Sequence, residues 1–140
     1  MTDYSNTKPP VWFWVVSVLA LLWNLMGVGA YLFGAYATEE IIDELEPQQQ
    51  FEMMYEYPSW YIALFALAVF GGVLGGIALL LRKKWAYLLF IISFLCATIQ
   101  QVYYVIKVEG VDQIMPIIVI VVCIFLVWFS KMSISKKWIK

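Results

Sequence analysis

The sequence predicts an all-α membrane protein: an antiparallel four-helix transmembrane bundle with a short amphipathic helix in its first outer loop. Hydrophobic residues make up 64% of the 140 residues, whereas soluble domains hold ~45–50%, and so small a soluble domain could not bury the excess. Four apolar runs are each long enough to cross a hydrocarbon core of ~30 Å. Charged residues, 14% of the chain, cluster between the runs. We therefore expect one membrane domain over residues 1–140, with the lipid bilayer as its solvent.

The predicted spans cover residues 11–36, 59–81, 85–106 and 113–129. Pro10 and Pro58 stand where a helix start tolerates proline, and Pro116 falls in the first turn of the fourth span, where it causes no kink. The first run, followed by Ala35 and Ala37, also suggests a signal peptide with a cleavage site. Its apolar stretch exceeds the ~7–15 residues of such a peptide, so we expect a retained span. A short basic tail follows the fourth span.

Residues 37–58, between the first two spans, contain seven acidic residues and no basic ones. Thr38 is placed to cap a short helix that ends before Pro47. Three apolar residues share one face of this helix: Ile41, Ile42 and Leu45. Helices that bind anionic lipid have a basic polar face, so we expect the acidic helix to cap the outer mouth of the bundle instead. The acidic residues lack the spacing of a calcium loop, which favours plain solvated charge over cation binding.

Basic residues predict the orientation of the spans. Eight of the nine lie on one side of the predicted membrane, and only Lys107 lies on the other. The positive-inside rule then places both termini in the cytoplasm and the acidic loop outside. The net charge of −1 argues against nucleic acid as a partner.

Glycines in the second span predict close helix contacts. Residues 70–76 (FGGVLGG) contain two overlapping GxxxG patterns, formed by Gly71 with Gly75 and by Gly72 with Gly76. Positions without side chains let a neighbouring backbone approach closely, and such packing holds helices together in lipid. This face is also one candidate seam for a homodimer.

Two spans carry a stripe of polar residues on one face. In the first span the stripe recurs every seven residues, at Ser17, Asn24 and Tyr31. In the third span it follows steps of four, three and four residues, at Ser93, Ala97, Gln100 and Tyr104. Asn24 and Gln100 are predicted to lie within ~5 Å of the same depth, so their amides can form a hydrogen bond. Gln101 points about 100° away from Gln100, toward the second or the fourth span.

These stripes have two interpretations. In the first, the polar side chains only join helices, and each contact contributes roughly 0.6 kcal/mol. In the second, they line a small polar cavity that opens outward and binds a neutral hydroxylated solute. The candidate ligand-binding residues are Asn24, Tyr31, Gln100, Gln101 and Tyr104.

The sequence argues against catalysis and against metal or cofactor binding. Histidine is absent, and Cys96 and Cys123 lie inside apolar runs without the spacing of a zinc or haem site. No Asp, Glu, Lys, Arg or His lies in the central part of any span, which leaves no intramembrane acid, base or proton carrier. We expect no enzymatic activity, no cofactor and no metal.

Four segments resemble a group of small bacterial four-helix inner-membrane proteins, some of whose members are described as sugar transporters. They are residues 21–28 (LLWNLMGV), 69–75 (VFGGVLG), 79–86 (LLLRKKWA) and 124–131 (IFLVWFSK). The resemblance implies solute transport, with Asn24 and Gln100 as ligands. The leading hypothesis is thus a membrane protein that binds or moves a small neutral solute such as a sugar, acting as a dimer. The alternative is a structural or accessory subunit that binds another membrane protein.

Overall fold

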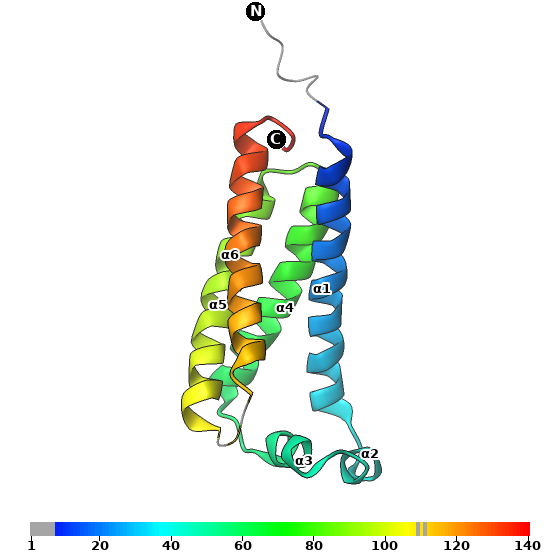
Figure 1. Ribbon diagram of the computed structural model, residues 1–140, viewed down its shortest axis with the longest axis vertical. Coiled ribbons are helices and arrows are strands. Elements are labelled where there is room, and N and C mark those ends of the chain that lie inside the picture. Colours follow the sequence, from blue (N-terminus) through cyan, green and yellow to red (C-terminus); the bar gives the residue numbers. More distant parts are fainter. Residues whose placement is uncertain (1–7, 109, 111) are drawn as a thin grey trace, which may run out of the picture.

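The computed structural model describes residues 8–108, 110 and 112–140, and this part of the chain is helical (Figure 1). Four long apolar helices can each span a membrane by length and composition, which confirms the predicted helical bundle. They are α1 (Val11–Tyr36), α4 (Ser59–Leu80), α5 (Trp85–Lys107) and α6 (Ile114–Ser135). Two short helices, α2 (Glu39–Asp43) and α3 (Pro47–Met54), lie across one end of the bundle.

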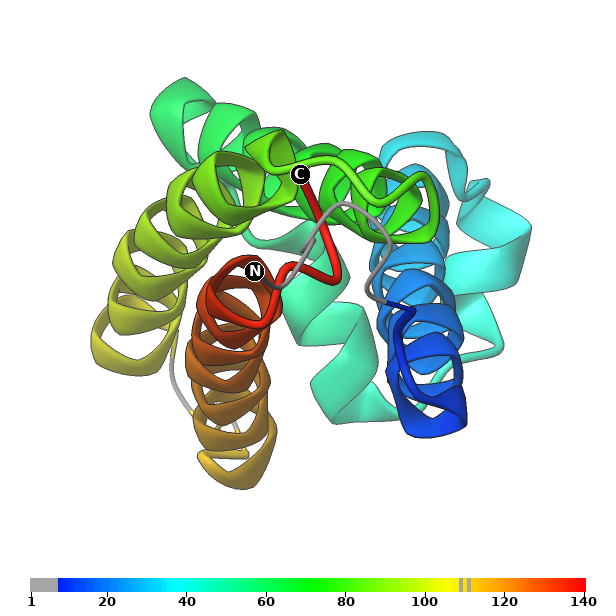
Figure 2. The same cartoon turned by 90° about the horizontal axis from the view of Figure 1, so that it is seen from above.

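The long helices α1, α4 and α5 form an arc with α4 in the middle, and α6 lies on the inner side of this arc beside α5 (Figure 2). α1 packs on α4, α4 on α5, and α5 on α6. α1 and α6 meet at the end where the C-terminus lies, through the rings of Phe13 and Phe129 at 5.7 Å. We call this the basic end, because it holds the basic turn at Arg82. The opposite, acidic end holds α2 and α3.

One pair of glycines on α4 accommodates α1. Gly72 lies against the side chain of Asn24, and a Cβ at Gly76 would lie 3.1 Å from the Cα of Leu21. Residues four apart on a helix share a face, so this pair forms a shallow track for the α1 backbone. Gly72 and Gly76 are both buried by this contact.

The other pair of glycines faces α5. A Cβ at Gly71 would lie 3.8 Å from Ser93, and one at Gly75 would lie 2.8 Å from the ring of Phe90. Ser93 also donates a hydrogen bond of 2.6 Å from its hydroxyl to the backbone oxygen of Ala68 on α4. Both GxxxG patterns therefore contact helices of this chain, and a homodimer seam on the same face stays a prediction.

The acidic loop contains two helices where one was predicted. Thr38 caps α2 as expected, accepting a bond of 3.4 Å from the backbone N–H of Ile41. α2 ends at Asp43, and α3 then begins with Pro47 at its first position and a capping box between Glu46 and Gln49. A proline is unfavourable inside a helix but favourable in its first turn. The sequence predicts Pro47 only as the end of a helix, whereas in the structure it also begins α3.

The basic end is closed by the C-terminal segment. α6 continues six residues beyond the predicted end of the fourth span, and Ser133 bonds the carbonyl of Phe129 at 2.8 Å. Lys137 then adopts a left-handed conformation with φ of 63°, which turns the chain back over the bundle. Trp138 and Ile139 are 8% and 1% exposed and join the hydrophobic core. The tail is basic, as the sequence shows, but two of its residues are apolar and buried.

Candidate functional site

Asn24 is buried between α1 and α4. Its side-chain Nδ2 donates a hydrogen bond of 2.8 Å to the backbone oxygen of Ala20, one turn earlier on the same helix. Its side-chain oxygen lies against Gly72, whose missing Cβ leaves the space that the amide occupies. The expected contact with Gln100 is wrong, because α4 separates the two residues.

Tyr31 lies on the same face of α1, nearer the acidic end. Its ring contacts Phe65 at 5.6 Å and Phe70 at 5.9 Å, both on α4. The first polar stripe therefore packs against α4 rather than facing the stripe on α5.

Gln100 is the centre of a polar network on α5. Its Nε2 donates a hydrogen bond of 2.9 Å to the hydroxyl of Tyr61 on α4, and its Oε1 accepts one of 2.8 Å from Gln101. Gln100 and Tyr61 are each 5% exposed. A buried amide is costly without partners, and here the partners come from α4 and from the neighbouring residue.

Aromatic side chains extend this network to the acidic end. The ring of Tyr61 stacks on Tyr57 at 4.4 Å and contacts Tyr103 at 5.2 Å. The hydroxyls of Tyr103 and Tyr55 lie 3.5 Å apart and join α5 to the segment after α3. These four tyrosines thus pack against one another and connect α4, α5 and the segment between α3 and α4.

Glu52 is the half-buried carboxylate beside these rings. Gln48, one turn earlier on α3, donates a hydrogen bond of 3.1 Å to it. Burial is the main cause that raises the pKa of Tyr57 above its ordinary value, and the neighbouring Tyr61 and Glu52 add to the increase. Tyr57 therefore stays neutral in the folded protein at physiological pH.

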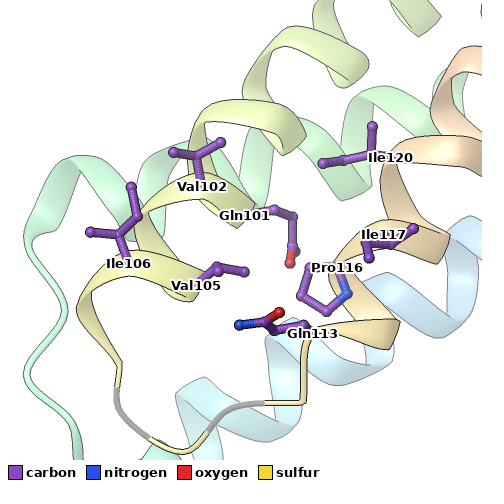
Figure 3. Close-up of a pocket in the computed structure, with 8 residues that line it drawn as sticks. All are labelled: Gln101, Val102, Val105, Ile106, Gln113, Pro116, Ile117 and Ile120. Carbon is purple, nitrogen blue, oxygen red and sulfur yellow. The ribbon is translucent and has the colours of Figure 1, made fainter.

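A groove of about 270 Å³ runs between α5 and α6 near the acidic end (Figure 3). Gln101 points into it, toward Pro116, and Gln113 lies beside its lower part (Figure 3). Apolar side chains form the rest of the wall: Val102, Val105, Ile106, Ile117 and Ile120. The groove thus offers two amides on an apolar surface, and Gln101 links it through Gln100 to Tyr61.

The structure brings three of the five candidate ligand-binding residues to one region and leaves two elsewhere. Gln100, Gln101 and Tyr104 lie at the acidic half of α5, whereas Asn24 and Tyr31 contact α4 on its other side. Sequence analysis missed Tyr61 and Glu52 as members of the network. Tyr57 precedes Pro58 and lies outside α4, so helical spacing does not link it to Tyr61, and no pattern reveals which helices meet.

No cluster able to hold a metal ion is found in the described ranges. They hold no group of three or more His, Cys, Asp or Glu residues able to bind a metal ion, and Cys96 and Cys123 are half-buried, free cysteines. Two buried hydroxyls, those of Ser17 and Thr98, have no hydrogen-bond partner among these same residues.

Comparison with known proteins adds no family to these observations. No protein-family model, no curated protein and no solved structure matches the chain.

Proposed function

We propose that the protein is a small, non-enzymatic membrane subunit that associates laterally with another membrane protein. The supporting observation is that the amides and hydroxyls expected to line a solute pathway mostly bind one another or the backbone. Asn24 bonds Ala20, Ser93 bonds Ala68, and Gln100 bonds Tyr61. A transport pathway needs polar groups that can exchange their partners for a solute, whereas paired groups stabilise a fixed helix arrangement.

The face that we assign to the partner is the half of α1 toward the acidic end. Leu32 and Phe33 are each 43% exposed, and a Cβ at Gly29 or Gly34 would meet nothing within 4 Å. Six of the seven carboxylates of residues 37–58 are exposed beside it. We infer a partner with an apolar transmembrane helix and a basic outer surface, in a bacterial inner membrane with both termini of this chain in the cytoplasm.

Site-specific photo-crosslinking in native membranes tests this proposal. A photoreactive residue at Phe33 is expected to give one discrete adduct with another protein. The control position is Ile99, 52% exposed on α5, which is expected to give lipid adducts alone. Replacing Glu39, Glu40 and Glu44 by glutamine should lower the yield of the protein adduct at Phe33. Identical adducts at Phe33 and Ile99 would contradict the proposal.

A second candidate function is the binding of a small neutral amphiphile in the groove between α5 and α6. The supporting observation is that Gln101 and Gln113 are the polar residues of an otherwise apolar wall. A sugar would bury several hydroxyls against that wall without partners, at about 1–3 kcal/mol each. The groove therefore favours a ligand with one or two hydroxyls and an apolar body over a sugar.

Thermal stabilisation of the purified protein by medium-chain alcohols and diols tests the second candidate. A ligand at a hundred times its Kd stabilises a protein by about 2.7 kcal/mol. Gln101→Leu should abolish the effect, whereas Thr98→Val, a change on the same helix outside the groove, should preserve it. Equal stabilisation of both variants would exclude the groove as the binding site.

A further inference from the structure

The turn between α4 and α5 carries three consecutive basic residues, and the fold brings a fourth beside them. The backbone N–H of Lys140 donates a hydrogen bond of 3.0 Å to the oxygen of Arg82, and Lys84 donates one of 3.0 Å to the oxygen of Lys140. Arg82 also donates from Nε to the oxygen of Trp138 at 2.7 Å. Two segments far apart in the sequence thus converge on a single cationic cluster, formed by Arg82, Lys83, Lys84 and Lys140.

The members of this cluster differ in role. Arg82 and Lys140 hold the two segments together through the hydrogen bonds from Arg82 Nε to Trp138 and from the Lys140 backbone N–H to Arg82. Lys83 and Lys84 are exposed and extend from the turn. α5 begins at Trp85, so the positive end of its helix dipole adds to the field of the two lysines.

Charge at the basic end is not balanced by acidic side chains of the described residues. Their Asp and Glu residues all belong to the loop of residues 37–58 or to Asp112, at the acidic end. The turn is also bracketed by exposed apolar residues, Leu81 at 59% and Trp85 at 47%. Cations flanked by exposed apolar side chains complement a molecule with an anionic head and a hydrocarbon chain.

We propose that the α4–α5 turn, held by the C-terminal segment, binds the headgroup phosphate of an anionic phospholipid. Lys83 and Lys84 contact the phosphate, and the acyl chain lies along Leu81 and Trp85. The strap formed by residues 138–140 fixes the shape of the turn, because its backbone bonds both Arg82 and Lys84. This proposal does not depend on which partner or ligand the acidic end binds.

Thermal unfolding of the full chain in mild detergent, titrated with lipid, tests the proposal. Phosphatidylglycerol should stabilise the protein, whereas phosphatidylcholine, which has no net charge, and inorganic phosphate, which has no acyl chain, should not. Each lysine near an anionic headgroup contributes roughly a fivefold gain in binding. Lys84→Gln should therefore weaken phosphatidylglycerol binding about fivefold, and the double variant Lys83→Gln/Lys84→Gln about twentyfold.

Lys131→Gln is the matched control, because it removes one exposed charge from the basic end but lies on α6, outside the turn. It should change the affinity less than twofold. Equal losses in Lys84→Gln and Lys131→Gln would show diffuse attraction rather than a site and would overturn the proposal. Stabilisation by inorganic phosphate alone, or equal stabilisation by both lipids, would overturn it as well. Circular dichroism of each variant verifies that the helices are intact.

Discussion

The contact between Asn24 and Gly72 can be tested by a double-mutant cycle. A Cβ at Gly72 would overlap the side-chain oxygen of Asn24, so Gly72→Ala must displace the amide or push α1 away from α4. Asn24→Ala removes the obstructing amide and leaves space at the same point. The effect of Gly72→Ala therefore depends on which residue occupies position 24.

The magnitudes follow from two opposing effects of the added methyl group. Overpacking a tight contact costs about 1–3 kcal/mol. Replacing glycine by alanine inside a helix stabilises the folded protein by about 1 kcal/mol, because alanine has the higher helix propensity. In the wild-type background Gly72→Ala should therefore destabilise the protein by about 1 kcal/mol. In the Asn24→Ala background the overlap is gone, so the same change should stabilise it by nearly 1 kcal/mol.

Equilibrium unfolding in detergent micelles measures the four proteins of the cycle. The expected coupling between the two positions is about 2 kcal/mol, far above the ~0.3–0.5 kcal/mol error of additivity. Gly29→Ala is the control, because nothing lies within 4 Å of a Cβ at that position and the change should be neutral or stabilising. Additive effects at positions 24 and 72 would refute the close packing of α1 on α4.

Three further predictions concern the two ends of the bundle. Trp138→Ala should lower stability by about 3–5 kcal/mol in thermal unfolding, whereas Trp128→Ala, at a ring that is 55% exposed, should have little effect. Gln100→Leu should cost about 1–3 kcal/mol in the same assay, because it leaves the Tyr61 hydroxyl without its amide partner. Burial raises the pKa of Tyr57 above 10.0, so its contribution to stability is complete below pH 10 and is lost as the pH rises further. Tyr57→Phe should therefore flatten the decline of stability with pH measured above about pH 10.

The four spans could be predicted from the sequence because each depends on local properties. Apolar length sets where a helix can cross lipid, and prolines and basic turns set its ends. α1 begins and ends where the sequence analysis placed it, at Val11 and Tyr36. α6 is longer than predicted because the hydroxyls of Ser130 and Ser133 donate hydrogen bonds to backbone carbonyls of the same helix. Both serines can therefore remain helical inside the core.

The neighbours of each helix could not be predicted in the same way. Asn24 and Gln100 share a depth, but depth does not determine which helix lies beside which. The glycines of α4 decide this point, because Gly72 and Gly76 admit α1 on one face while Gly71 and Gly75 admit α5 on another. α4 thereby becomes the central helix, and the two polar stripes face it from opposite sides.

The same arrangement leaves α1 with an unequal set of contacts along its length. At the basic end Phe13 is fully buried, with its ring 5.7 Å from Phe129 and 5.8 Å from Trp138. Toward the acidic end α1 has α4 as its packing neighbour, and residues 32–36 are all exposed. A helix held firmly at one end and uncovered at the other can accept a neighbouring helix without unpacking its own bundle. This asymmetry supports a subunit that keeps its fold while its uncovered flank meets a partner.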